Sequence, residues 1–227
     1  MISTPWPGAI LTRIAKSHIR VGTFQYAAAL GNKENLSQLL AYTVNRHYPE
    51  LRNSDDLPLA FFQAVLDRQA DLVSRWMLVG FVHGVMNTDN VSIAGETIDY
   101  GPCAFLDVYH PETVFSSIDH QGRYAFQNQP SITQWNLARL AESLVQVVPG
   151  NPEDAVGKFV EILETFPSCY EKYFKTGANA KLGLTTMEKE DFAIYSDLLK
   201  IMEEYQLDFT ETFVTLADGI EQSETDP

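Results

Sequence analysis

The sequence predicts a mainly α fold with a small β portion. Several long stretches repeat apolar residues at the helical period, whereas strand-like runs are short and few. The chain has 227 residues, of which 45% are hydrophobic, and this is enough for one substantial core. Two short runs, 91–93 and 96–98, are joined at Ala94-Gly95, a turn signal that predicts a hairpin.

The expected elements follow in order along the chain. Residues 9–15 read as a strand and 17–22 as a turn. The helix at 57–82 is apolar on most faces, so we expect it at the centre of a helical lobe. The polar tail at 219–227 is expected to be disordered. The helical pattern predicts helices at 32–48, 57–82, 130–148, 153–165, 167–176, 187–205 and 210–217.

Composition excludes several classes of protein. The net charge is −14 and the pI is about 4.6, which argues against generic nucleic-acid binding. No apolar run reaches the roughly 18 residues that a membrane span needs, and the first residues do not resemble a signal peptide. Cys103 and Cys169 lie far apart with no C-x-x-C pattern, which indicates a reduced protein. We therefore expect a cytoplasmic monomer that binds neither nucleic acid nor membrane.

The segment from 82 to 102 concentrates polar chemistry. Asp89 and Asn90 end a polar loop, and the predicted hairpin carries Asp99 back toward Asn90. We expect the three side chains to converge on one point. Hard oxygen ligands of this kind suit Mg²⁺ or Mn²⁺ held together with substrate phosphates. Asn90 and Asp99 are the predicted metal ligands.

The same segment has the layout of a kinase catalytic centre. His83 and Asn90 take the first and last positions of the catalytic loop, and D-Y-G at 99–101 takes the place of D-F-G. This predicts a protein-kinase-like C-lobe with a catalytic-loop hairpin. Val85 falls on the catalytic Asp position and cannot accept a proton, so Asp89 is the predicted general base. We expect His83 to pack and to hydrogen-bond the loop backbone.

These motifs resemble the selenoprotein O family of protein adenylyltransferases. The resemblance runs over residues 5–217 and is carried by H-G-V-M-N-T-D-N at 83–90, T-I-D-Y-G-P at 97–102, and the stretches 7–24 and 119–130. It implies transfer of AMP from ATP to Ser, Thr or Tyr hydroxyls of proteins, with the α-phosphate of a flipped ATP facing the acceptor.

The resemblance also implies that Arg13 and Arg20 contact the ATP phosphates. A guanidinium suits this role because its fork meets two phosphate oxygens at once. Read from the residues alone, both arginines fit equally well as surface cations lying over apolar area.

The sequence contains no G-x-G-x-x-G, P-loop or V-A-I-K pattern. We therefore expect a kinase-like helical lobe over 1–218, with 1–24 as the end of an N-lobe or hinge and the N-lobe largely missing. A fragment or shortened homologue of this kind is expected to show weak or no catalysis by itself. The alternatives are an atypical kinase and a non-catalytic kinase-fold binding module.

Overall fold

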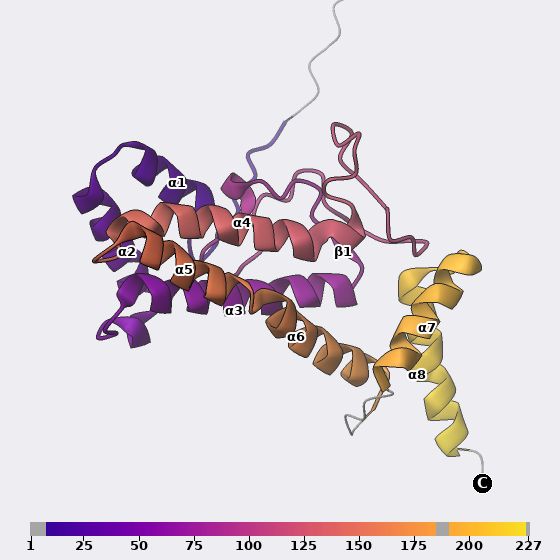
Figure 1. Ribbon diagram of the computed structural model, residues 1–227. Helices are drawn as coiled ribbons and strands as arrows, with labels where there is room; N and C mark the ends of the chain where they lie inside the picture. Colours follow the sequence, from indigo (N-terminus) through magenta and orange to yellow (C-terminus); the bar gives the residue numbers. More distant parts are fainter. Residues whose placement is uncertain (1–7, 185–190, 226–227) are drawn as a thin grey trace, which may run out of the picture.

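The computed structural model describes residues 8–184 and 191–225, and helices make up most of it (Figure 1). The prediction of a mainly α fold with a small β portion is confirmed. Two short antiparallel strands, β1 (Phe81–Val82) and β2 (Ala104–Phe105), form the sheet in register Phe81↔Phe105. The helices are α1 (Val21–Ala29), α2 (Lys33–His47), α3 (Leu57–Leu78), α4 (Gln129–Leu144), α5 (Pro152–Leu163), α6 (Phe166–Lys181), α7 (Asp191–Glu204) and α8 (Phe209–Thr225).

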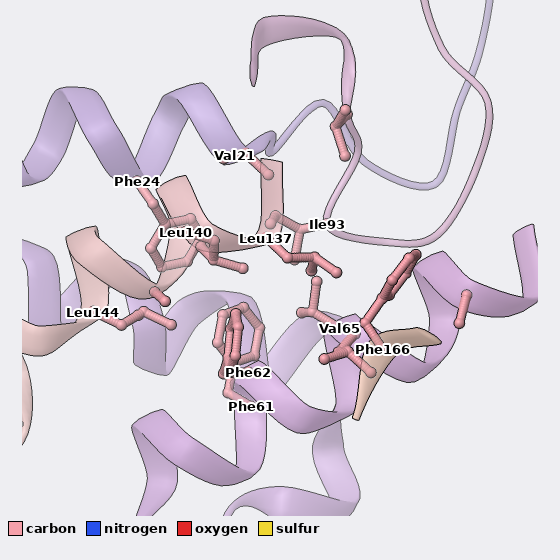
Figure 2. Close-up of a cluster of buried hydrophobic side chains, with 14 of the residues drawn as sticks. Val21, Phe24, Phe61, Phe62, Val65, Ile93, Leu137, Leu140, Leu144 and Phe166 are labelled. Atoms are coloured by element: carbon pink, nitrogen blue, oxygen red, sulfur yellow. The ribbon is translucent and has the colours of Figure 1, made fainter. Parts of the chain in front are cut away.

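Helix α3 is the centre of the main core, as its apolar pattern predicts. Phe61 and Phe62 are fully buried on it, and Phe62 packs edge-on against Phe159 of α5 at 5.2 Å between ring centroids. Figure 2 shows the rings of α3 meeting Phe24 of α1 and Leu140 of α4 in one cluster. Burying a side chain of this size contributes about 1.5–3 kcal/mol, so this cluster is the main source of stability beneath the hairpin.

A second apolar cluster joins α7 and α8 to the rest of the chain. These two helices lie together at one end of the molecule (Figure 1), where Phe209 and Tyr195 are almost fully buried. The segment after β2 fastens them, because the backbone N–H of Phe209 donates to Asp107 O at 2.6 Å and that of Tyr109 to Leu207 O at 2.9 Å.

The predicted strand at 9–15 is wrong. The backbone there is irregular, and no described strand runs beside it to accept its hydrogen bonds. The turn expected at 17–22 is wrong in its second half, because α1 begins at Val21. Thr23 explains this start, since its Oγ1 accepts from the backbone N–H of Arg20 at 3.1 Å.

Several helix ends also differ from the prediction. Helix α3 ends at Leu78 rather than at 82, because Gly80 takes a φ of 69° and the next two residues enter β1. Helix α6 continues past 176 to Lys181, since Gly177 lies against Leu78 in a contact that a local pattern does not record. Helix α8 extends to Thr225, beyond the expected end at 217 and through most of the tail predicted to be disordered.

The remaining boundaries agree within a few residues. Helix α2 has Asn32 as its N-cap, with the side chain accepting from the backbone N–H of Asn35. Of the helix predicted at 187–205, the part before Asp191 lies outside the described residues. Among the helices at 8–184 and 191–225, none is both long and apolar enough to cross a membrane.

Candidate functional site

A cavity of about 640 Å³ lies between the N-terminal segment and the loop at 90–100. Four of the five predicted site residues line it: Arg13, Arg20, Asn90 and Asp99. The other lining residues are Ile14, Ala15, His18, Leu72, Gly95, Glu96, Thr97, Ile98 and Tyr100. Side chains that are far apart in the sequence therefore share one space.

Backbone pairing brings the N-terminal segment to this loop. Residues 19–21 run antiparallel to 91–93, and Arg20 bridges to Ser92. The backbone N–H of Val21 donates to Val91 O, and that of Ile93 to Ile19 O, both at 3.0 Å. This pairing places Arg20 beside the segment that carries Asn90.

The turn predicted at Ala94-Gly95 is present. Gly95 has a φ of 71°, a conformation that favours glycine, and its N–H donates to Ser92 O at 3.2 Å. The arms of the hairpin are joined by a single bridge, Val91↔Thr97, rather than by the two regular short strands that the sequence predicts. On the side of 91–93 that faces the second arm, Ser92 O is taken by the Gly95 N–H and by Gln69 Nε2.

Side chains of the helical core hold the hairpin from beneath. Each bonds a group on the hairpin, and all four are themselves buried. The pairs are Tyr48 Oη to Ile93 O (2.6 Å), Gln69 Nε2 to Ser92 O (2.7 Å), Trp76 Nε1 to Thr97 Oγ1 (2.9 Å) and His83 Nε2 with Ile98 O (2.8 Å). The position of the cavity-lining loop is therefore set by the core.

His83 has the structural role expected of it. It is fully buried, and its Nδ1 accepts from the backbone N–H of Val85 at 3.4 Å. Nε2 is then the protonated nitrogen that donates to Ile98 O. Burial lowers the pKa of His83, against the opposing effects of the Ile98 carbonyl and the Asp99 charge. The neutral ring thus ties the loop at 83–90 to the hairpin.

Asn90 and Asp99 offer hard oxygen donors to the cavity. Asn90 uses its Nδ2 to donate to Val85 O at 2.9 Å, so its amide oxygen is the atom left to act as a ligand. Asp99 is exposed and adopts a φ of 58°. Within the described ranges, no group of three or more His, Cys, Asp and Glu residues could hold a metal ion. The donor set fits Mg²⁺ that also takes phosphate oxygens and water.

The two arginines differ in their surroundings. The Nε of Arg20 is buried and has no hydrogen-bond partner among the described residues. A buried donor without an acceptor costs free energy, and a phosphate oxygen would supply one. Arg13 is exposed, with its guanidinium 5.2 Å from the centroid of the Tyr100 ring. Arg20 is thus the better supported of the two as an anion ligand.

Glu96 is a cavity-lining residue that sequence reasoning missed. Its carboxylate accepts from the backbone N–H of Lys16 at 3.0 Å and lies 3.2 Å from Lys16 Nζ. Burial alone would raise the pKa of Glu96, but the hydrogen bonds and charge of Lys16 together outweigh it and lower that pKa. The contact fastens the segment bearing Arg13 to the hairpin. No local pattern could reveal it, because the partners are 80 positions apart.

The side chain of Asp89 does not line the cavity. It lies outside the described lining of the cavity, and its Oδ1 occupies the space above Gly22, in the first turn of α1. Asn90 and Asp99 therefore line one cavity and Asp89 does not, whereas their convergence on a shared metal stays a prediction. The signal that could have shown this is Gly22 itself, since a glycine within a helix often marks a close approach.

Comparison with known proteins now decides the family. Residues 3–227 match the family described as "Protein adenylyltransferase SelO". The chain belongs to this family. It is 54% identical over 217 residues to "Protein nucleotidyltransferase YdiU" of Bacillus mycoides, covering 96% of this chain and 44% of that protein. The YdiU proteins of Syntrophotalea carbinolica (53% over 214 residues; 94% and 44%) and Alcanivorax borkumensis (54% over 219 residues; 96% and 45%) are similar to the same extent.

Membership of the SelO family confirms the resemblance drawn from the motifs at 83–90 and 97–102. The chain spans less than half the length of these YdiU relatives. The names of the family and of these relatives identify nucleotidyl transfer as the chemistry of the family. They assign no residue roles, so the roles of Arg13, Arg20, Asp89, Asn90 and Asp99 stay predictions.

Proposed function

We propose that this chain carries the nucleotide-binding face of a Mg²⁺-dependent protein adenylyltransferase, which moves AMP from ATP to Ser, Thr or Tyr hydroxyls of protein substrates. The observation that carries the proposal is the shared cavity, which two arginines, one amide and two carboxylates line together. Its volume of about 640 Å³ lies within the usual range for small-molecule sites, roughly 300–1,000 Å³. Family membership supplies the reaction class.

Each residue has one role in this scheme. Arg13 and Arg20 pair with phosphate oxygens, and Asn90 and Asp99 hold Mg²⁺, which when bound offsets charge on the phosphates. Asp89 orients the acceptor hydroxyl and accepts its proton. The acceptor oxygen forms a bond to the α-phosphorus as the bond from that phosphorus to the bridging oxygen breaks, so pyrophosphate leaves.

The order of elements supports a kinase-like C-lobe, which we propose as the finer description of the fold. The buried helix α3 leads through β1 into the loop at 83–90 and the hairpin. In the same description, residues 8–24 are the end of an N-lobe or hinge. We also propose a cytoplasmic monomer that binds no nucleic acid. The net charge of −14 and the free thiols of Cys103 and Cys169 are consistent with this.

Labelled ATP tests the reaction. With Mg²⁺ and a mixture of candidate protein substrates, we expect label from the α-phosphate to enter protein, weakly from this chain alone, and label from the γ-phosphate to stay out. Asp89→Asn should abolish transfer yet keep Mg-ATP affinity. Asp99→Asn should weaken that affinity by roughly tenfold or more.

Asp218→Asn, an exposed substitution on α8, is the matched control and should change neither quantity. Entry of γ-label in place of α-label would instead identify an atypical kinase. A calorimetric titration that detects no Mg-ATP binding would identify a non-catalytic binding module.

A further inference from the structure

Asp89 lies directly over a glycine of α1. A Cβ built on Gly22 would stand 2.1 Å from Asp89 Oδ1 and 3.1 Å from its Cγ. Carbon atoms at Cβ essentially never approach other heavy atoms within 3.0 Å. We propose that Gly22 is a positioning residue for Asp89, because its missing side chain is the space that the carboxylate occupies. The proposal rests on the proposed function, in which Asp89 accepts the proton of the acceptor.

The backbone of Gly22 does not itself require glycine. Its φ lies outside the left-handed region in which glycine is favoured, so any L-residue could adopt it. Glycine is also among the poorest helix formers, and α1 is a short helix of nine residues, V-G-T-F-Q-Y-A-A-A. Alanine would serve the helix better here. The remaining physical reason for glycine is the room it leaves for Asp89.

A larger residue at 22 would move the carboxylate rather than the helix. The first turn of α1 is fixed by the bond from the Val21 N–H to Val91 O and by the complete burial of Val21 and Phe24. The backbone of Asp89 is fixed as well, because its N–H donates to Asn87 Oδ1 at 3.0 Å. The exposed side chain of Asp89, with two rotatable bonds, is the part free to turn away, by about an ångström.

The first turn of α1 thereby links two parts of the proposed site. Arg20 is the N-cap of α1 and lines the cavity, and Gly22, two positions later, lies under Asp89. This turn sets the separation between the predicted phosphate-binding and proton-accepting groups. The acceptor hydroxyl would then approach from the side of α1.

Gly22→Ala tests the proposal directly. A misplacement of about 1 Å can lower a rate about 100-fold, so we expect kcat for AMP transfer to fall about that much. Mg-ATP affinity, measured by calorimetry, should stay within about twofold, since Asp89 lies outside the described lining of the cavity. Gly157→Ala on α5 is the matched control, because no atom lies within 4 Å of its added Cβ. It should leave both quantities unchanged.

A double-mutant cycle of melting temperatures provides a readout that does not depend on activity. Melting temperatures are compared for the wild type, Gly22→Ala, Asp89→Ala and the double variant. With Asp89 removed, Gly22→Ala should raise the melting temperature by about 2 °C, as expected for a better helix former. With Asp89 present, the rise should be lost or reversed.

Equal rises in both backgrounds, or unchanged transfer by Gly22→Ala, would overturn the proposal. If the wild type neither binds Mg-ATP nor transfers AMP, the proposed function fails. The double-mutant cycle of melting temperatures then still decides whether Gly22 holds the Asp89 carboxylate in place.

Discussion

Asp99 is held in a left-handed backbone conformation, and a pair of substitutions can separate its backbone from its carboxylate. With a φ of 58°, its Cβ crowds the neighbouring carbonyl, which costs a non-glycine residue about 1–2 kcal/mol. Asp99→Gly removes this strain, and Asp99→Ala keeps it. Both variants lack the carboxylate, and Asp99 is exposed, so burial is little changed in either. The difference in stability between the two variants therefore reports the backbone conformation of residue 99 alone.

The greater chain entropy that glycine loses on folding, about 0.5–1 kcal/mol, offsets part of the gain. We therefore expect Asp99→Gly to be more stable than Asp99→Ala by about 1 kcal/mol, or roughly 2–4 °C in melting temperature for a chain of this size. Urea unfolding and thermal melts measure this difference. Equal stability of the two variants would refute the assignment of strain. Mg-ATP affinity should fall equally in both variants. A wild-type affinity in either variant would exclude Asp99 as a metal ligand.

Three further predictions concern the core, a helix end and the hairpin. Phe62→Ala should lower the free energy of unfolding by about 3–5 kcal/mol in urea, because it empties a fully buried site against Phe159. Burial lowers the pKa of Lys181 to about 8 from an ordinary value of 10.5, so the unfolded chain binds more protons between these values. Stability should therefore rise as the pH goes from 8 to about 9.5, and urea unfolding of Lys181→Met across that range should lack the rise. Glu96→Gln should speed tryptic cleavage after Lys16 by up to ~5-fold, since a partly exposed ion pair contributes up to about 1 kcal/mol. A cleavage rate equal to that of the wild type would show that the pair does not fasten this segment.

The sequence predicts the candidate site well where chemistry and geometry are both local. Ala94-Gly95 predicts the turn, and the turn returns Asp99 to the neighbourhood of Asn90, so both line one cavity. The long apolar pattern of α3 likewise predicts a central helix. In each case residues close together in the sequence determine the local conformation.

The sequence fails where a distant contact decides the conformation. The irregular segment before α1 is held by the pairing of residues 19–21 with 91–93, and α6 runs through Gly177 because that glycine packs on Leu78. The direction of Asp89 depends on Gly22, which lies 67 positions earlier in the printed sequence. Contacts between residues this far apart produce no periodic pattern in the sequence.

The hydrogen bonds that fix the hairpin from below have a consequence for genetics. Tyr48 and Gln69 touch no residue of the proposed chemistry, yet each bonds a carbonyl in the arm that leads to the turn. A replacement of similar size such as Gln69→Leu would change no residue that lines the cavity, yet it would release the loop that shapes it. A random screen for inactive mutants should therefore recover the buried positions Tyr48, just after α2, and Gln69 of α3 alongside the polar residues that line the cavity.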